Sequence, residues 1–419
     1  MSKRSSSNTL YTNDNLYVLS GMNSESVDLI YLDPPFNSKR MYSAPVGSKA
    51  AGASFKDMWT WKDVDEYYLD TLAGQFPTLT KYIATAGEVH SKPMMAYLTY
   101  MSQRIIEMHR ILKNTGSLYL HCDPTASHYI KILLDFIFGK NNFRNEIVWC
   151  YKGPSGAKKN FPAKHDTILR YSKSDAFVFN SDLVRIPYKA LHTDKGKNAK
   201  IWKTEGKLQD ETIRQDYLDK GKIPEDFWTD IPSGGHISPN ERTGYPTQKP
   251  LALLHRIIKA SSNEGDVVMD PFCGCATTCV AAQQLGRKWI GIDMETQAVN
   301  ILVERLTDAQ GQLFKDFVAT DQIPKRSDVN EVLPSESIKQ RLYKEQEGKC
   351  NACRLNFEIW NLEIDHIVPK SKGGGNYYEN YQLLCGSCNR IKGDRPMEYL
   401  RLKIETRERM MKKVIFFGE

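Results

Sequence analysis

Short apolar runs alternate with segments of helical periodicity from Leu16 to about Phe317. That alternation is typical of an α/β domain built around a mostly parallel sheet. One run, SVDLIYLD over 26–33, has the length and composition of a buried strand, and it ends at two prolines. Residues 94–113 instead carry apolar side chains at intervals of three and four, which predicts a long helix.

The same alternation predicts further elements on both sides of a less regular region. We expect strands at 117–121, 145–151, 266–270 and 288–293, helices at 126–138 and 276–285, and a turn followed by a helix within 245–262. Residues 152–241 are rich in Lys, Asp, Gly and Pro without a sustained period, which indicates an inserted recognition region or long loops over the sheet. A polar stretch with two prolines over 321–337 is the expected linker. The sequence therefore predicts a large domain over 1–320 and a small one over 338–419.

Length and composition agree with an ordinary globular protein of two or three folded units. The chain has 419 residues, of which 41% are hydrophobic and 26% charged. No apolar run is long enough to span a membrane, and the first residues lack the apolar core of a secretion signal, so we expect a cytoplasmic protein. The net charge is +7, and residues 337–419 hold 16 Lys or Arg against 11 Asp or Glu. The small domain is therefore basic, which favours an acidic partner.

A glycine-bearing motif, Asp270-Pro-Phe-Cys-Gly-Cys-Ala-Thr-Thr278, follows one predicted strand and opens a helix. Open α/β sheets bind ligands at such strand ends. Gly274 lets a ligand approach the backbone, and Asp293 at the end of the next strand could hold ribose hydroxyls. The motif indicates a nucleotide site, although the same residues could form only a structural turn capped by Asp and Thr.

A second motif, Asp33-Pro-Pro-Phe36, also follows a strand directly. The two prolines fix the backbone and leave the Asp33 carboxylate and the Pro34 carbonyl as acceptors beside the Phe36 ring. This arrangement suits an exocyclic amino group on a planar ring that stacks on the phenyl face. Alone, the motif could equally be a rigid turn.

Together these motifs resemble those of the amino-group DNA methyltransferases that use S-adenosylmethionine, in the permuted (beta) class whose catalytic motif precedes the cofactor motif. The resemblance covers about residues 11–317. Residues 31–37 (YLDPPFN) resemble the catalytic motif, 247–250 (TQKP) the element beside the methionine part of the cofactor, and 270–278 the cofactor loop. One departure is Ala276, where the family usually has Gly.

The resemblance implies a Rossmann-like sheet and direct methyl transfer to the exocyclic amine of a flipped base in double-stranded DNA. Asp33 and Pro34 would orient the amine, Pro35 would hold the turn and Phe36 would stack on the base. A leading Asp favours adenine N6 over cytosine N4. The family's cofactor positions fall on Asp14, Thr247, Gln248, Lys249, Pro250, Asp270, Phe272, Cys273, Gly274, Thr277 and Asp293.

Residues 152–241 would then read the DNA sequence. Trp149 and Tyr151, just before this region, could form an aromatic wall for the base or belong to the core. The basic side chains of the region could contact phosphates or lie on a solvated loop surface. They are Lys152, Lys158, Lys159, Lys164, Arg170 and Lys173.

The small domain contains two CxxC pairs. Cys350 and Cys353 form the first, Cys385 and Cys388 the second, and 31 residues separate the pairs. Such paired spacing predicts a tetrahedral zinc site. Because a small domain with a thin core gains folding free energy from a metal, and four thiolates leave no open position for water, we expect a structural zinc.

Other polar residues of this domain predict a second metal. Asp365 and Asn389 suit a hard divalent ion, and His366 could deprotonate a water beside it, although a lone His on a strand is often structural. The surrounding sequence, with LLCGSCNRIKG over 383–393, resembles the HNH nuclease family. That resemblance implies a ββα-metal fold in which His366 is the general base, Asp365 and Asn389 bind Mg²⁺ or Mn²⁺, and Asn380 orients His366. Tyr381 stands where an apolar residue is more common.

The two resemblances together predict a methyltransferase fused to a DNA endonuclease, as in restriction and modification. Two alternatives stay open. The zinc module could bind DNA without cutting it, or the methyl acceptor could be RNA. Since one HNH site cuts one strand, a homodimer would explain double-strand cleavage.

Overall fold

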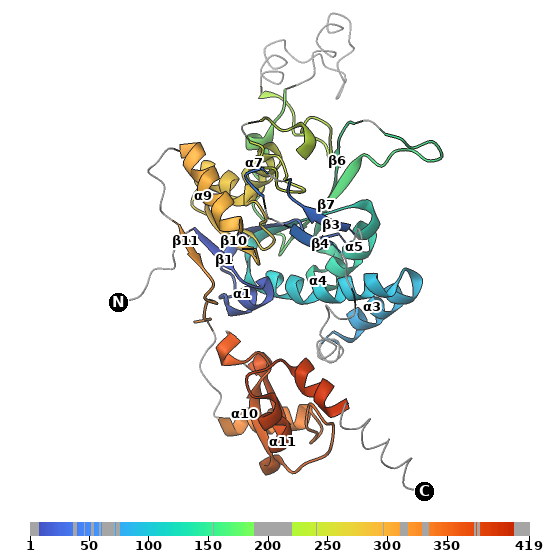
Figure 1. Ribbon diagram of the computed structural model, residues 1–419, viewed down its shortest axis with the longest axis vertical. Coiled ribbons are helices and arrows are strands. Elements are labelled where there is room, and N and C mark those ends of the chain that lie inside the picture. The colour runs from blue at the N-terminus through green and yellow to red at the C-terminus, as the bar shows by residue number, and fades with distance from the viewer. Residues whose placement is uncertain are drawn as a thin grey trace, which may run out of the picture.

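The computed structural model describes residues 8–36, 40–45, 47–51, 54–57, 60, 72, 76–153, 155–187, 220–239, 241–295, 297–310, 317–328, 335–372, 374 and 378–405. They form a large α/β domain and a small C-terminal unit, each with its own hydrophobic core (Figure 1). None of the helices in these ranges is long and apolar enough to cross a membrane.

The described part of the large domain is built on a nine-stranded sheet in the order β11-β1-β10-β9-β2-β5-β7-β6-β8. The strands are β1 (Thr9–Thr12), β2 (Val27–Leu32), β5 (Leu112–Cys122), β6 (Phe143–Cys150), β7 (His165–Ser172), β8 (Phe227–Trp228), β9 (Val267–Asp270), β10 (Lys288–Asp293) and β11 (Val318–Thr320). All neighbours pair in parallel except β7, which is antiparallel to both β5 and β6. Strands β3 (Arg40–Ser43) and β4 (Ser54–Asp57) form a separate hairpin. The predicted mostly parallel sheet is confirmed.

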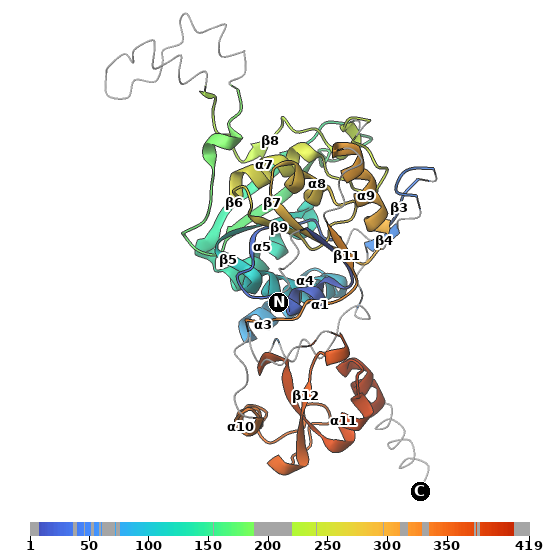
Figure 2. The same cartoon turned by 90° about the vertical axis from the view of Figure 1, so that its left-hand side faces the viewer.

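Helices cover both faces of this sheet (Figure 2). One face carries α1 (Asn15–Gly21), α3 (Pro77–Val89), α4 (Lys92–Ile111) and α5 (Pro124–Phe138), and the other carries α7 (Leu251–Ser261), α8 (Thr277–Gln284) and α9 (Gln297–Gln310). Because side chains alternate across a strand, Leu32 of β2 packs under the first group and its neighbour Tyr31 under the second. A sheet buried on both faces explains why every β2 residue except Asp28 is apolar or aromatic.

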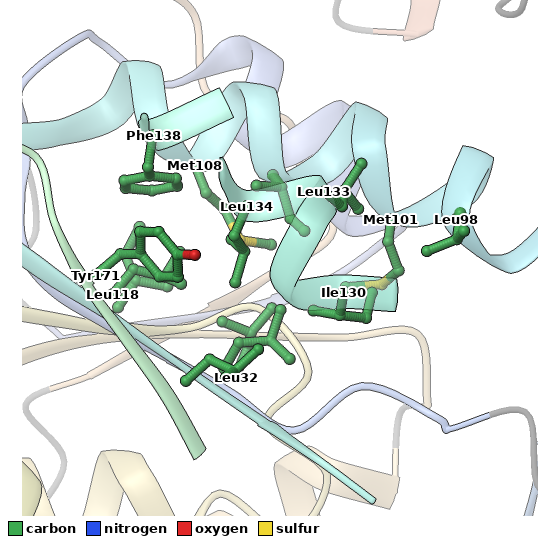
Figure 3. Close-up of a cluster of buried hydrophobic side chains, with 14 of the residues drawn as sticks. Leu32, Leu98, Met101, Met108, Leu118, Ile130, Leu133, Leu134, Phe138 and Tyr171 are labelled. Carbon is green, nitrogen blue, oxygen red and sulfur yellow. The ribbon is translucent and has the colours of Figure 1, made fainter. Parts of the chain in front are cut away.

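The core beneath α4 and α5 follows from the helical spacing of their apolar residues. Met101 and Met108 of α4 and Leu134 of α5 meet Leu32 and Leu118 of the sheet, and all five are fully buried (Figure 3). Side-chain caps fix where both helices begin. Ser91 accepts a hydrogen bond from the Met94 amide, Asp123 accepts one from the Ala126 amide, and a proline occupies each first turn.

Strand β7 corrects the expectation that residues 152–241 lack regular structure. Its hydrophobic pattern is weak because three of its buried residues, Thr167, Arg170 and Ser172, are polar. The guanidinium of Arg170 lies over the ring of Phe179 at 4.5 Å, and Lys173, just past the strand, donates to the Leu112 carbonyl at 2.5 Å. Both residues were candidates for phosphate contacts, and both instead hold the sheet together. Residues 188–219 of the predicted recognition region lie outside the described residues.

The first part of the predicted linker is also held against the large domain. The Ser327 amide donates to Asn23 Oδ1 at 2.7 Å, and the Ser24 amide donates to Asp328 Oδ2 at 2.7 Å. Burial acts against ionisation of Asp328, but hydrogen bonds from Arg326 and Ser24 outweigh it and lower the pKa of this carboxyl. Residues 329–334 lie outside the described part.

The C-terminal unit contains α10 (Ser335–Glu345), β12 (Leu362–His366), β13 (Tyr381–Cys385) and α11 (Gly386–Lys392). Strands β12 and β13 pair antiparallel, and α11 packs on both. Its core is small and includes three of the four CxxC cysteines together with Leu362, Leu383, Leu384, Met397 and Leu400. Two strands and two helices with so few buried residues need an additional source of stability.

Candidate functional site

The two motifs of the large domain meet at one edge of the sheet. Asp33–Phe36 follows β2 and Asp270–Gly274 begins at the end of β9, and these strands are parallel neighbours. A cavity of about 520 Å³ opens between them. The predicted catalytic and cofactor residues around it are Asp33, Pro34, Pro35, Phe36, Thr247, Gln248, Lys249, Asp270, Phe272, Cys273, Gly274, Thr277 and Asp293. Motifs more than 230 residues apart in sequence thus share one cavity.

Two predicted cofactor residues do not line this cavity. Asp14 caps α1 by accepting from the Leu16 amide at 2.8 Å, and it pairs with Arg104 at 2.9 Å. Pro250 stands immediately before α7. Asn37, the last residue of the catalytic motif, lies outside the described residues.

Sequence reasoning missed other residues of the cavity wall. Asn13 and Asn15 lie on either side of Asp14, so the prediction of Asp14 identified the correct segment but not the lining residues. Tyr245 was within the predicted turn before α7. Tyr31, Pro271, Cys275 and Thr278 lie within the two recognised motifs but were not named as site residues. Local sequence carried no signal for the rest, which are Tyr42, Asp57, Tyr100, Leu254, Ile292, Met294 and Glu295.

The carboxylate of Asp33 has two different environments. Its Oδ2 accepts from the Lys249 ammonium at 2.5 Å, and that ammonium also lies 5.6 Å from the centre of the Phe36 ring. Its Oδ1 is buried and has no hydrogen-bond partner among the described residues. Buried acceptors are normally satisfied, so this oxygen marks a position where a ligand N–H donor would be stabilised.

A buried polar layer lies behind Phe36. The Phe36 ring is nearly parallel to the ring of His121, with centroids 6.1 Å apart. His121 is fully buried, with Nδ1 3.0 Å from the Tyr31 hydroxyl and Nε2 3.1 Å from Asp166 Oδ2. Burial opposes ionisation of Asp166, but its contacts with His121 and the charge of Lys249 outweigh burial and lower the pKa of this carboxyl. No sequence motif pointed to His121 or Asp166, because they come from neighbouring antiparallel strands.

The two aromatic residues before the recognition region differ in role. Trp149 is buried, donates from its indole to the Ile231 carbonyl at 3.1 Å and meets His121 edge to face, so it belongs to the core. Tyr151 is half-buried and donates to Asp166 Oδ1 at 3.2 Å. Neither of them lines the cavity.

The cofactor loop is held by two buried acids. Asp270 accepts from the Thr278 hydroxyl at 2.5 Å and from the Phe272 amide at 3.0 Å. Burial raises the pKa of Asp270 to about 7 despite these bonds. Asp293 accepts from the Gly274 amide at 2.8 Å, and burial raises the pKa of this carboxyl as well.

Two residues of this loop have left-handed backbone conformations. Gly274 has φ +49°, and a Cβ there would lie 3.0 Å from the Tyr245 ring, so a side chain would crowd the cavity wall. Ala276, at the position where the family usually has Gly, has φ 57° and ψ 32° and is fully buried. The structure therefore explains the family's preference for Gly at position 276, since that residue tolerates a left-handed backbone.

The four CxxC cysteines of the C-terminal unit come together as predicted. The sulfurs of Cys350, Cys353, Cys385 and Cys388 all lie within 4.8 Å of one another. The Cys385 amide donates to the Cys350 sulfur at 3.2 Å, a bond that stabilises a thiolate. Four converging thiols, without a disulfide between them, fit a tetrahedral zinc ion.

The predicted ligands of the second metal lie where β12 meets α11, but they have different partners. Asp365 pairs with the Lys392 ammonium at 3.0 Å and accepts from Gln382 at 2.8 Å. Asn389 donates to Glu363 at 2.5 Å. Apart from the cysteines, the described residues contain no group of three or more His, Cys, Asp or Glu close enough to hold a metal.

The Asn380 side chain, predicted to orient His366, bonds the backbone close to it. The Asn380 side chain accepts from the Val368 amide at 2.8 Å and donates to the Val368 carbonyl at 3.1 Å. It thereby fixes the backbone two residues after His366. The His366 ring packs against Tyr381 with centroids 4.9 Å apart, so the unusual aromatic residue at position 381 contacts the predicted base.

Comparison with known proteins gives two family matches. Residues 27–304 match the family described as DNA methylase, and residues 350–395 match the family described as HNH endonuclease.

Individual relatives match this chain at modest identity. The type II methyltransferase M.HpaI of Haemophilus parainfluenzae is 31% identical over 235 residues, which are 55% of this chain and 64% of that protein. The DNA adenine methyltransferase YhdJ of Escherichia coli is 28% identical over 334 residues, covering 78% of this chain and 93% of that protein. The crystal structure of the M1.HpyAVI–SAM complex aligns with a TM-score of 0.39 and 19% identity, over 71% of this chain and 98% of that one. The chain thus spans less than two thirds of M.HpaI but nearly all of YhdJ.

Proposed function

Because the chain belongs to the DNA methylase family and carries an HNH domain at its C-terminal end, we propose that it methylates the exocyclic amine of a flipped base in double-stranded DNA. One observation carries this proposal. Asp33 Oδ1 is a buried acceptor without a described partner, and it belongs to the same cavity wall as the glycine-bearing loop. The methyl donor and the amine would therefore face each other in one enclosed space.

The cavity fits S-adenosylmethionine. Its volume of about 520 Å³ is in the range of small-molecule sites, and Gly274 leaves the backbone accessible where a side chain would crowd Tyr245. Asp293 would accept the ribose hydroxyls, and Thr247 and Lys249 would flank the methionine part. When bound, the cofactor supplies an electrophilic methyl group on its sulfonium.

The protein's own residues would orient the target base. Asp33 Oδ1 and the Pro34 carbonyl accept the two amine N–H groups, which directs the nitrogen lone pair toward the methyl donor. Phe36 stacks on the flipped ring, and His121 supports Phe36 from behind. The Asp33 carboxylate is also the nearest acceptor for the proton that the amine loses after transfer. Since the motif begins with Asp, we propose adenine N6 as the acceptor.

Radiolabelled methyl transfer to unmodified DNA tests this function. Wild type should label DNA, and Asp33→Ala should lose at least about 100-fold in rate, as expected when a reacting group is no longer positioned. Asp33→Ala should still bind S-adenosylmethionine in a calorimetric titration, which shows that the cavity is intact. Equal labelling by the two proteins would contradict the assigned role.

The identity of the base needs a second measurement. Single-molecule sequencing of DNA from cells that express the protein would report the modified base and its context. Methylated adenine within a fixed sequence supports the proposal, and methylated cytosine would contradict the adenine assignment. Competition between duplex DNA and RNA in the labelling assay would expose an RNA substrate.

For the C-terminal unit we propose a DNA endonuclease with His366 as general base and Asp365 and Asn389 as ligands of Mg²⁺ or Mn²⁺. Asp365 and His366 end β12, and Asn389 lies on the adjoining helix α11, so the three come from elements in direct contact. In a chain that also methylates DNA, this activity would serve restriction and modification, with a homodimer cutting both strands.

A second candidate function is DNA binding by the zinc unit without cleavage. The contact between Asp365 and Lys392 favours it, because the ammonium occupies the carboxylate that would bind the catalytic metal. Plasmid nicking with Mg²⁺ or Mn²⁺ separates the two candidates. Loss of nicking in His366→Ala, with zinc content unchanged, supports the nuclease, whereas binding without nicking by wild type supports the alternative.

A further inference from the structure

The connection between β6 and β7 is a basic projection of the large domain. It leaves β6 after Cys150 and returns at His165, and residues 151–164 contain four Lys and neither Asp nor Glu. Figure 1 shows this green segment beside the β6 label, extending away from the sheet. Its described residues from 155 to 163 are all exposed.

The base of this connection is joined to the layer behind the catalytic motif. The Tyr151 amide donates to the Lys164 carbonyl at 3.0 Å and closes the two ends of the segment. The Tyr151 hydroxyl bonds Asp166, and Asp166 bonds His121, on whose ring Phe36 stacks. The projection therefore starts directly behind the ring proposed to hold the flipped base.

The outer part of the connection combines an exposed aromatic ring with unpaired positive charge. Phe161 is 100% exposed, the highest value among the large hydrophobic residues that the structure describes. Lys158 and Lys159 precede it, and neither has a carboxylate partner within the described ranges. Positive charge favours a polyanion over an uncharged protein surface, and a phenyl ring stacks well on nucleobases.

Resting on the proposed function, we propose that Phe161 inserts between base pairs beside the flipped nucleotide while Lys158 and Lys159 contact the adjoining phosphates. Extruding a base breaks its stacking and opens a gap in the duplex. An apolar wedge that fills the gap recovers stacking and removes the Phe161 ring from water. The rigid base of the projection would keep the wedge in a fixed register with the catalytic pocket.

Two substrates distinguish this role from a merely structural one. Both carry the recognition sequence found by sequencing, but in one duplex the target base faces an abasic site and is already unpaired. Phe161→Ala should lower kcat/KM at least tenfold on the fully paired duplex and by less than twofold on the abasic duplex. Phe161→Trp should restore most of the loss, because it also provides a stacking ring.

Controls separate the wedge from other effects. Trp360→Ala removes another highly exposed aromatic ring, in the C-terminal unit, and should leave kcat/KM unchanged on both duplexes. The double variant Lys158→Ala with Lys159→Ala should weaken binding of both duplexes alike and reduce the slope of log K against log salt by about 2.

The opposite results are equally clear. If Phe161→Ala methylates both duplexes at the wild-type rate, the ring does not act on DNA. A protein partner then becomes the better explanation for the exposed ring. If both rates fall equally with an unchanged unfolding midpoint, Phe161 acts in the transfer step or in general binding, and the wedge is wrong. Failure of wild type on both duplexes would instead contradict the proposed function.

Discussion

The ammonium of Lys249 lies 2.5 Å from Asp33 Oδ2 and so joins two motifs that are 216 residues apart in the chain. The Lys249 side chain is only 10% exposed and that of Asp33 only 17%, which makes this a mostly buried ion pair. The family resemblance implies that Lys249 lies beside the cofactor, and the structure shows that it lines the cavity and pairs with Asp33. Lys249 thus occupies Oδ2 and leaves Oδ1 as the acceptor that we propose for the target amine.

Replacing Lys249 should therefore reduce catalysis more than cofactor binding. In Lys249→Met the carboxylate loses its charged partner and its fixed orientation, and kcat should fall by about 10- to 100-fold. Steady-state methylation kinetics would measure this. Lys113→Met is a matched control, because Lys113 pairs with Asp28 at the opposite end of β2. A raised KM for S-adenosylmethionine with unchanged kcat would show that Lys249 acts on the cofactor instead.

Asp270 should make the stability of the large domain depend on pH. Its pKa rises from 3.8 in an unperturbed carboxyl to about 7 in the fold, mainly through burial. The folded state therefore binds this proton more tightly than the unfolded chain does, and the stability it contributes is full below pH 4 and is lost as the pH rises through 7. Between pH 5 and 8 the loss should be on the order of 3 kcal/mol.

Urea unfolding of wild type and Asp270→Asn over that pH range checks this expectation. The substitution removes the titrating group, so the unfolding free energy of wild type minus that of Asp270→Asn should fall by about 3 kcal/mol from pH 5 to pH 8. A difference that stays constant from pH 5 to 8 would show that Asp270 does not titrate in this window.

Ala276 should be a position where glycine stabilises the fold. A left-handed backbone costs an L-residue roughly 1–2 kcal/mol, a cost that glycine avoids. Glycine's larger conformational entropy in the unfolded chain offsets part of this gain. Ala276→Gly should therefore gain up to about 1 kcal/mol in thermal or urea unfolding. Ala281→Gly, at a buried helical position of α8, should instead lose about 1 kcal/mol. Destabilisation by both substitutions would contradict the strain assigned to Ala276.

The cysteine cluster should bind one zinc ion per chain and depend on all four thiols. Cys388→Ser should lose the metal, measured by atomic emission, and residues of the C-terminal unit should become sensitive to protease. Methyl transfer should persist, because the core around the cluster shares no residue with the cores of the sheet domain. Cys150→Ser, outside the cluster, is the matched control. Full zinc content in Cys388→Ser would exclude the proposed coordination.

The sequence by itself determined the elements whose signals are local. The apolar run from Leu29 to Leu32, directly before Asp33, predicted β2, because a strand buried on both faces needs apolar residues at consecutive positions. The spacing of Cys350 to Cys353 and of Cys385 to Cys388 predicted a metal cluster for the same kind of reason, since neighbouring ligands are fixed by short segments of chain.

Only the tertiary structure decided which distant residues meet. Strand β7 was missed because its buried positions include Arg170, whose charge is stabilised by aromatic rings from other segments. The contacts of Lys249 with Asp33 and of His121 with Asp166 depend on which strands are neighbours and in which direction they run. Strand order is set by packing across the whole sheet, so the sequence around each residue of such a contact does not reveal its partner.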